Sequence, residues 1–210
     1  EKVLFLSTVE IYGENRGDLD KFTEDYCGYI DCNTLRAGYP EGKRASESLC
    51  QAYIQKYGID VVIPRISRTF GPTMLLSDSK ASSQFIMNAV HKENIVLKSA
   101  GTQLYSYAYV ADIVSALLFL LVKGQKGEAY NVSNEHCDIT LRTFAETLAN
   151  VAGTKVIHGE ATAQEKQGFS KATKALLDNQ KIYALGWRPL YDSMEEPLKH
   201  TIKILEGSGN

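Results

Sequence analysis

The sequence predicts an α/β protein in which a parallel sheet carries a smaller mixed lobe of helices and strands. A continuous apolar run over 3–7 is typical of a strand that is covered on both faces. A long crossover, a helix over 39–57 and a second apolar strand over 59–66 follow it. This order is the signature of two parallel strands joined by a helix. No repeat or low-complexity linker interrupts the chain, so we predict one α/β unit with the smaller lobe packed on it.

The crossover begins with a polar stretch over 14–35 that has few apolar anchors and is predicted to be a long loop. Loops of this length in compact domains are often functional. Apolar residues then recur at helical spacing over 39–57, where Pro40 suits the first turn and Gly58 suits the end of a helix.

Helices and short strands alternate in the rest of the chain. Apolar residues at helical spacing predict helices over 81–91, 110–123, 139–152 and 192–206. Short apolar runs predict strands over 95–97, 104–109, 129–132 and 155–158. The longest apolar run, 114–122, is too short to span a bilayer, so it predicts a buried helix and no membrane partner.

Composition narrows the class of protein. The chain has 210 residues, 44% of them hydrophobic and 23% charged, with a formal net charge of −2. This balance is typical of a soluble globular protein, and the lack of a basic excess argues against nucleic acid as a partner. The four cysteines form no CxxC pair and have no histidine at zinc-ligand spacing. They predict free thiols, a reducing cytoplasm and no metal site.

Tyr39 and Lys43 are the strongest candidates for catalysis. Residues four apart at the start of a helix lie on one face, and a nearby ammonium group favours the phenolate form of tyrosine. Lys43 is therefore expected to lower the pKa of Tyr39 towards the range useful to a general base. Because the chain has 12 tyrosines, such a pair also arises by chance, and the alternative is an exposed aromatic ring beside a solvated lysine.

The surrounding sequence favours the catalytic interpretation. Thr8 and Glu10 follow the first strand, and the segment 65–72 ends the second strand. Ligand crevices of open α/β sheets lie at the carboxyl ends of parallel strands, so these segments and the helix start should converge there. The alternatives are an ordinary strand-end hydroxyl for Thr8 and a solvated carboxylate for Glu10.

Six motifs, taken in order, resemble those of the extended short-chain dehydrogenase/reductases in the NAD-dependent epimerase/dehydratase family. They are STVEIYG, RAGYPEGKRASE, RISRTFGP, AYVADI, GEAYNVSN and LGWRP. The likeness covers nearly the whole chain and is nearest to the UDP-glucuronate decarboxylase and dTDP-glucose 4,6-dehydratase branches. It implies the C-terminal part of a Rossmann-like parallel sheet with a smaller mixed α/β substrate lobe. Residues 1–70 would be the remaining strands and catalytic helix of the NAD-binding domain. Residues 71–210 would be mainly the substrate lobe, with 107–133 returning to the sheet.

The resemblance implies NAD as cofactor and a nucleotide-diphosphate sugar as substrate. Tyr39 would take the proton from the sugar C4 hydroxyl as hydride passes to the nicotinamide, and Thr8 would hydrogen-bond the same oxygen. Lys43 would hold the nicotinamide ribose, Ile66 would line the cofactor site, and Glu10 would act near C5 and C6. A 4-keto group acidifies C5 or weakens the bond to a C6 carboxylate, so one oxidation serves decarboxylation, epimerisation and elimination.

The implied substrate site includes Thr69, Arg68 and Tyr105, and it departs from the family pattern. Val9 stands where hexose 4,6-dehydratases carry an acidic residue, which argues against 4,6-dehydration. Tyr105 stands where the family usually has arginine, and Arg68 stands where relatives usually have asparagine. We expect Arg68 to supply the charge that Tyr105 lacks. The alternatives are a solvated loop arginine or one that pairs with Glu10.

The GxxGxxG turn that opens the family's dinucleotide-binding domain does not occur in the 210 residues. We therefore expect the chain as given to bind NAD poorly and to catalyse little. A different function follows from the same observation, namely a cofactor-deficient, non-catalytic binding or regulatory homologue. The resemblance also implies a homodimer through the 39–57 helix, where Leu49, Tyr53 and Tyr57 suit a partly apolar outer face.

Overall fold

The computed structural model describes residues 1–75, 77–78, 80–162 and 173–208. One part of the molecule is built on a parallel sheet centred on β3. On one side β3 pairs with β1 and β2, and on the other with β7, all in parallel. Val61, Val62 and Ile63 of β3 are consecutive and buried, as expected for a strand covered on both faces. The described strands are β1 (Lys2–Leu4), β2 (Ser7–Thr8), β3 (Asp60–Ile66), β4 (Arg68–Phe70), β5 (Ile95–Leu97), β6 (Leu104–Tyr109), β7 (Ala129–Val132), β8 (Asp138–Thr140), β9 (Val156–His158) and β10 (Lys174–Ala175).

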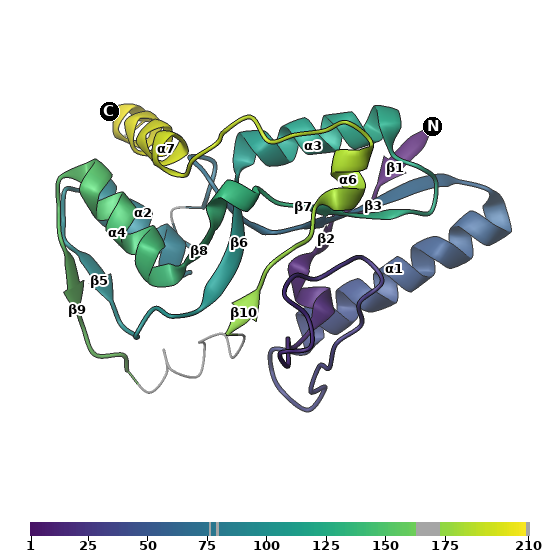
Figure 1. The fold of residues 1–210 in the computed structure, drawn as a ribbon, viewed down its shortest axis with the longest axis horizontal. Coiled ribbons are helices and arrows are strands. Elements are labelled where there is room, and N and C mark those ends of the chain that lie inside the picture. Colours follow the sequence, from purple (N-terminus) through teal and green to yellow (C-terminus); the bar gives the residue numbers. More distant parts are fainter. Residues whose placement is uncertain (76, 79, 163–172, 209–210) are drawn as a thin grey trace.

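Helices cover both faces of this sheet. Figure 1 shows α1 and α3 on opposite sides of it. The helix predicted over 39–57 is α1, and it ends at Gly58, whose left-handed backbone (φ 69°) favours glycine. The described helices are α1 (Gly38–Tyr57), α2 (Ala81–Val90), α3 (Val110–Lys123), α4 (Leu141–Ala152), α6 (Gln180–Ala184) and α7 (Glu195–Ser208), with 3₁₀ turns η1 (Val9–Tyr12) and η2 (Glu135–Cys137).

The second part of the chain forms a lobe beside the first sheet (Figure 1). Its sheet is built on β6, which pairs in parallel with β4 and β10 and antiparallel with β8. The pair β5 and β9 adds a small parallel sheet. Helices α2, α4 and α7 pack around a common core with these strands, and Phe144 and Leu148 of α4 are fully buried in it.

Several segments differ from the sequence-based expectation: β4, β10 and α6 were not predicted, and the helix predicted over 192–206 lies at Glu195–Ser208. Two further segments have other bounds or another structure than predicted. The strand predicted over 3–7 is divided into β1 and β2, with Phe5 and Leu6 between them. The helix predicted over 139–152 begins only at Leu141, because the Thr140 hydroxyl accepts a hydrogen bond from the backbone N–H of Thr143 (3.0 Å) and so caps the helix. Residues 138–140 form β8 instead.

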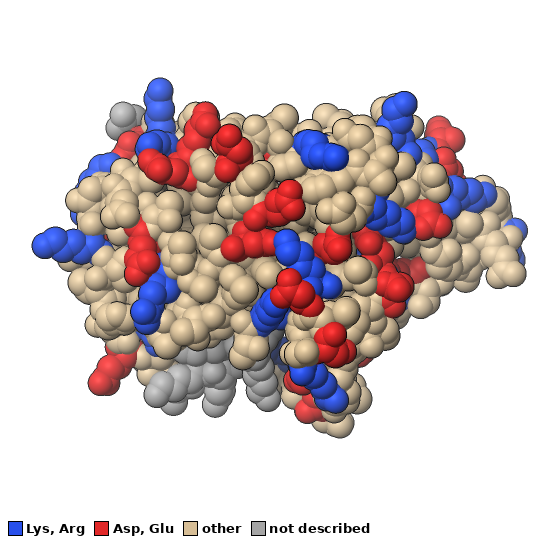
Figure 2. Space-filling model, in the orientation of Figure 1, with Lys and Arg blue, Asp and Glu red and all other residues tan. Residues whose placement is uncertain are grey.

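No helix in the described part of the chain is long and apolar enough to cross a membrane. On the face drawn in Figure 2, acidic and basic side chains are interspersed, in keeping with the small net charge.

Candidate functional site

Thr8 lies at the carboxyl end of β2, beside Ile66 at the carboxyl end of β3. The two residues are paired in the parallel register of the strands. Thr8 is buried, and its hydroxyl accepts a hydrogen bond from the backbone N–H of Glu10 (3.3 Å), which caps η1. The chain enters η1 directly after the extended residue Thr8, so Glu10 lies just beyond the strand end.

Tyr39 and Lys43 lie in the first two turns of α1, which packs against β2 and η1. The side chain of Tyr39 is 56% exposed and so is free of the core. The Lys43 ammonium donates a hydrogen bond to the Leu6 carbonyl (2.8 Å) and lies 5.0 Å from the centroid of the Phe5 ring. This bond ties the start of α1 to the segment that leads into Thr8.

Glu10 is held near Arg36 from the end of the long loop. Its carboxylate lies 3.9 Å from the Arg36 guanidinium and remains partly exposed. One alternative for Arg68 was an ion pair with Glu10, and no such pair is present among the described residues.

A buried network beneath the site was not anticipated from the sequence. Arg65 of β3 contacts the Glu47 carboxylate of α1 through two nitrogens, at 2.7 and 3.1 Å. It also donates to the hydroxyl of Tyr12 (3.0 Å), which in turn donates to the Asn131 side chain of β7 (2.6 Å). Burial raises the pKa of Tyr12, although the charge of Arg65 opposes the rise. Arg65, a charged residue in the otherwise apolar end of β3, was the sequence feature that could have indicated this network.

Thr69 lies in a cavity of about 230 Å³ at the carboxyl end of β4. Its hydroxyl donates to the Ser67 carbonyl (3.3 Å). Asp78 lines the same cavity and accepts hydrogen bonds from Lys80 and Ser83. Burial by itself would raise the pKa of Asp78, but the hydrogen bonds from Lys80 and the charge of Lys80 outweigh it and lower the pKa. No sequence pattern indicated Asp78, because it lies in a polar segment before α2.

Arg68 and Tyr105 stack on each other. The Arg68 guanidinium carbon lies 3.9 Å from the centroid of the Tyr105 ring, and Tyr105 is buried. Arg68 is half-buried, so it is not the solvated loop arginine that was the other alternative. Neighbouring Tyr107 is also buried, and its burial raises its pKa while the Arg68 charge opposes the rise.

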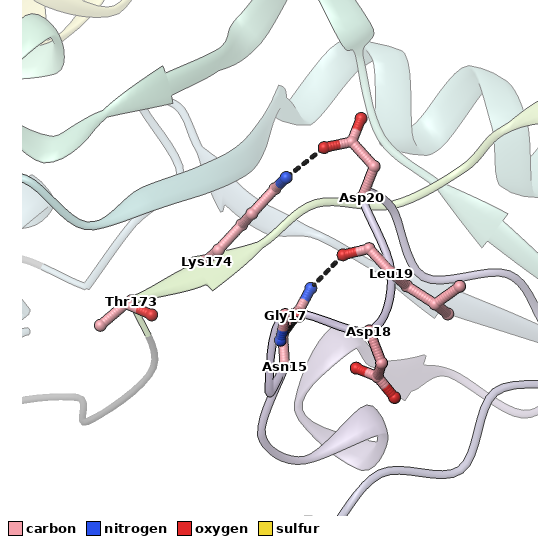
Figure 3. Close-up of a pocket in the computed structure, with 7 residues that line it drawn as sticks. All are labelled: Asn15, Gly17, Asp18, Leu19, Asp20, Thr173 and Lys174. Carbon is pink, nitrogen blue, oxygen red and sulfur yellow. Dashed lines mark hydrogen bonds and ion pairs between the residues drawn. The ribbon is translucent and has the colours of Figure 1, made fainter.

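A second cavity, of about 390 Å³, lies between the long loop and β10 and contains none of the predicted site residues. Figure 3 shows its lining. Asp20 forms an ion pair with Lys174, and the Asn15 amide donates to the Leu19 carbonyl (2.9 Å). Asp18 accepts a hydrogen bond from Tyr26 (3.1 Å). Because these polar groups already satisfy one another, we assign the cavity no role.

Several hydrogen-bonding groups near the strand end at Thr8 are not used by the described residues. An ammonium group has three donors, and the single hydrogen bond of Lys43 among the described residues leaves two of them for a ligand. The buried hydroxyls of Ser7 and Ser67, which flank the paired residues Thr8 and Ile66, have no hydrogen-bond partner among the described residues. Unsatisfied buried hydroxyls are costly, so this edge fits a polar ligand.

Comparison with known proteins identifies the family. The model of the NAD dependent epimerase/dehydratase family matches residues 1–133. UDP-glucuronic acid decarboxylase 1 of Xenopus tropicalis is 31% identical over 215 residues, which cover 100% of this chain and 49% of that protein. dTDP-D-glucose 4,6-dehydratase of Mus musculus is 28% identical over 208 residues, which cover 97% of this chain and 55% of that protein. The chain thus spans about half the length of the curated relatives it matches.

A solved structure shows the fold. UDP-glucose 4-epimerase of Thermotoga maritima, determined with UDP-glucose, superimposes with a TM-score of 0.82 at 22% identity, over 100% of this chain and 64% of that one. This likeness confirms the predicted α/β class with a Rossmann-like parallel sheet. The family model matches more than half of the chain, and the matched range includes Thr8, Tyr39, Lys43 and Ile66. The chain therefore belongs to the NAD-dependent epimerase/dehydratase family.

Proposed function

We propose that the chain forms the proton-transfer and substrate side of an NAD-dependent nucleotide-sugar enzyme that transiently oxidises the sugar at C4. The observation that best supports this proposal is the tie between Lys43 and the segment before Thr8, a hydrogen bond of 2.8 Å to the Leu6 carbonyl. It brings the tyrosine helix to the strand end that bears the threonine hydroxyl. When bound, NAD would supply the acceptor for the C4 hydride.

In this proposal Tyr39 takes the proton of the C4 hydroxyl, and Thr8 hydrogen-bonds the C4 oxygen and orients it. The two remaining donors of Lys43 hold the nicotinamide ribose. Glu10, held near Arg36 at 3.9 Å, acts next to C5 and C6. Val9 has no proton to give to a departing C6 hydroxyl, which favours decarboxylation or epimerisation over 4,6-elimination.

Turnover by the full-length protein tests this function. We expect UDP-glucuronate or UDP-glucose, incubated with the protein and NAD, to give a product that mass spectrometry and chromatography identify. Loss of carbon dioxide indicates decarboxylation, and an isomer of unchanged mass indicates epimerisation. Recovery of only the starting sugars from a panel of UDP- and dTDP-sugars would contradict the proposal.

The second candidate function, a non-catalytic binding or regulatory homologue, is favoured by the exchanged side chains at Arg68 and Tyr105. Such a protein would bind a nucleotide sugar without converting it. The same incubation distinguishes the two functions, because calorimetry would then detect binding while the mass of the sugar stays constant.

We also propose the domain division and the location in the cell. Residues 1–70 together with 107–133 would form the cofactor side, which is supported by the common sheet of β1, β2, β3 and β7. The rest of 71–210 would bind substrate. A cytoplasmic location is supported by the four cysteines, all of which are free thiols.

We expect the protein to form a homodimer through α1. The helix buries only Pro40, while Leu49, Tyr53 and Tyr57 are exposed on it, and apolar surface of this kind is stabilised by a partner. Light scattering at micromolar concentration should give twice the monomer mass. Leu49→Glu together with Tyr53→Glu should shift the protein to monomer, whereas a wild-type protein that is monomeric at this concentration would contradict the prediction.

A further inference from the structure

Arg68 occupies a defined position at the start of the second sheet. It opens β4, two residues after Ile66 ends β3 at the edge that bears Thr8. In the parallel ladder with β6, Arg68 lies opposite Tyr107, and its guanidinium stacks on the ring of Tyr105 at 3.9 Å. Stacking on a buried aromatic ring fixes the plane of a guanidinium and leaves its edges free to donate hydrogen bonds.

The charge of Arg68 lacks a counterpart in the described part of the chain. Among residues 1–75, 77–78, 80–162 and 173–208, its buried Nε atom has no hydrogen-bond partner, and no carboxylate lies within 4.0 Å of its nitrogens. Every other arginine contacts at least one oxygen. These contacts are Arg16 with Glu14, Arg36 with Glu10, Arg44 with the Ile11 carbonyl, Arg65 with Glu47, Arg142 with the Ala100 carbonyl and Arg188 with the Tyr183 carbonyl.

A half-buried cation without an anion is unfavourable, so the arrangement fits a negatively charged ligand. We propose that Arg68, held by Tyr105, binds the phosphate groups of the nucleotide sugar, an inference that rests on the proposed function. A planar guanidinium can donate two parallel hydrogen bonds to phosphate oxygens, which a lysine ammonium or the family's asparagine at this position does not. Arg68 thereby takes over the charge that the usual arginine at position 105 would supply.

Calorimetry with UDP and with uridine tests the assignment. Arg68→Ala should weaken UDP binding about 30-fold or more, because removing one partner of a partly buried charged pair costs at least about 2 kcal/mol. Uridine, which has no phosphate, should bind wild type and variant alike. Lys203→Ala, which removes an exposed positive charge on α7, is the charge-matched control and should bind UDP like wild type.

Further variants separate the contribution of the Tyr105 ring from that of the Arg68 charge. Tyr105→Phe keeps the ring and should retain UDP affinity within about threefold, whereas Tyr105→Ala should weaken it. The double variant Arg68→Asn with Tyr105→Arg carries the positive charge at position 105 instead of position 68. Its UDP affinity should regain most of what Arg68→Asn alone loses. Recovery also rules out misfolding as the cause of that loss.

Different results would overturn different claims. UDP affinity unchanged within twofold in Arg68→Ala would overturn the assignment of Arg68 alone. A loss confined to UDP-glucuronate, with UDP itself unaffected, would also overturn it, because the arginine would then serve a sugar carboxylate. Wild-type protein that binds no UDP would overturn both this inference and the proposed function. UDP binding through Arg68 without turnover of any sugar would support this inference and remove only the enzymatic proposal.

Discussion

Replacing Tyr39 with phenylalanine is expected to lower kcat of nucleotide-sugar turnover by about 10²–10⁴-fold, the usual contribution of a positioned general base. The substitution removes one hydroxyl and keeps the ring. In the proposed reaction that hydroxyl receives the C4 proton.

The fold should tolerate this change. Tyr39 is 56% exposed, so the loss of its hydroxyl disturbs no core packing. Steady-state kinetics should therefore show a fall in kcat, while UDP affinity and the urea midpoint stay at wild-type values. Such a pattern assigns the hydroxyl to the chemical step and not to binding or stability.

Tyr29→Phe is the matched control. Tyr29 is 50% exposed in the long loop and carries the same hydroxyl. Its loss should leave kcat within about twofold of wild type. If Tyr39→Phe turned over substrate as fast as Tyr29→Phe, Tyr39 could not be the base, and the non-catalytic alternative or another base would have to be considered.

The central elements could be predicted because their signals are local. Consecutive apolar residues predict β3, and helical spacing ended by Gly58 predicts α1, which the structure has at Gly38–Tyr57. The short strands β4, β8 and β10 were missed, since each begins with a charged residue and none forms a continuous apolar run as β5 does. They pair only because β6 presents free edges to them. Their formation depends on tertiary contacts that a sequence pattern does not contain.

The candidate site shows a similar division. Motif order suggested Thr8, Tyr39 and Lys43, and the parallel strand register explains how segments far apart in sequence reach one edge. The stacking of Arg68 on Tyr105 could not be foreseen, because it depends on β4 pairing with β6. The bond from Lys43 to the Leu6 carbonyl was also hidden, because backbone acceptors have no sequence signature.

The largest loss of stability is expected when the ion pair between Arg65 and Glu47 is broken. Each side chain is 12% exposed, and the pair joins β3 to the middle of α1 with a nitrogen–oxygen distance of 2.7 Å. Glu47→Ala would leave the Arg65 charge buried without its carboxylate, and breaking a buried pair in this way costs about 3–5 kcal/mol. With the urea dependence typical of small proteins, the unfolding midpoint should fall by roughly 1–3 M.

Glu146→Ala is the control, because Glu146 is an exposed helical glutamate on α4 and its removal should change the free energy of unfolding by less than about 0.5 kcal/mol. The combined change Glu47→Leu and Arg65→Met removes both charges and should recover much of the stability, since the cost lies in the unpaired charge rather than in the lost pair. A Glu47→Ala protein as stable as the Glu146→Ala control would mean that water reaches Arg65. Helix α1 would then have to be held in place by other contacts, such as the Arg44 bonds to the carbonyls of Ile11 in η1 and Gly28 in the long loop.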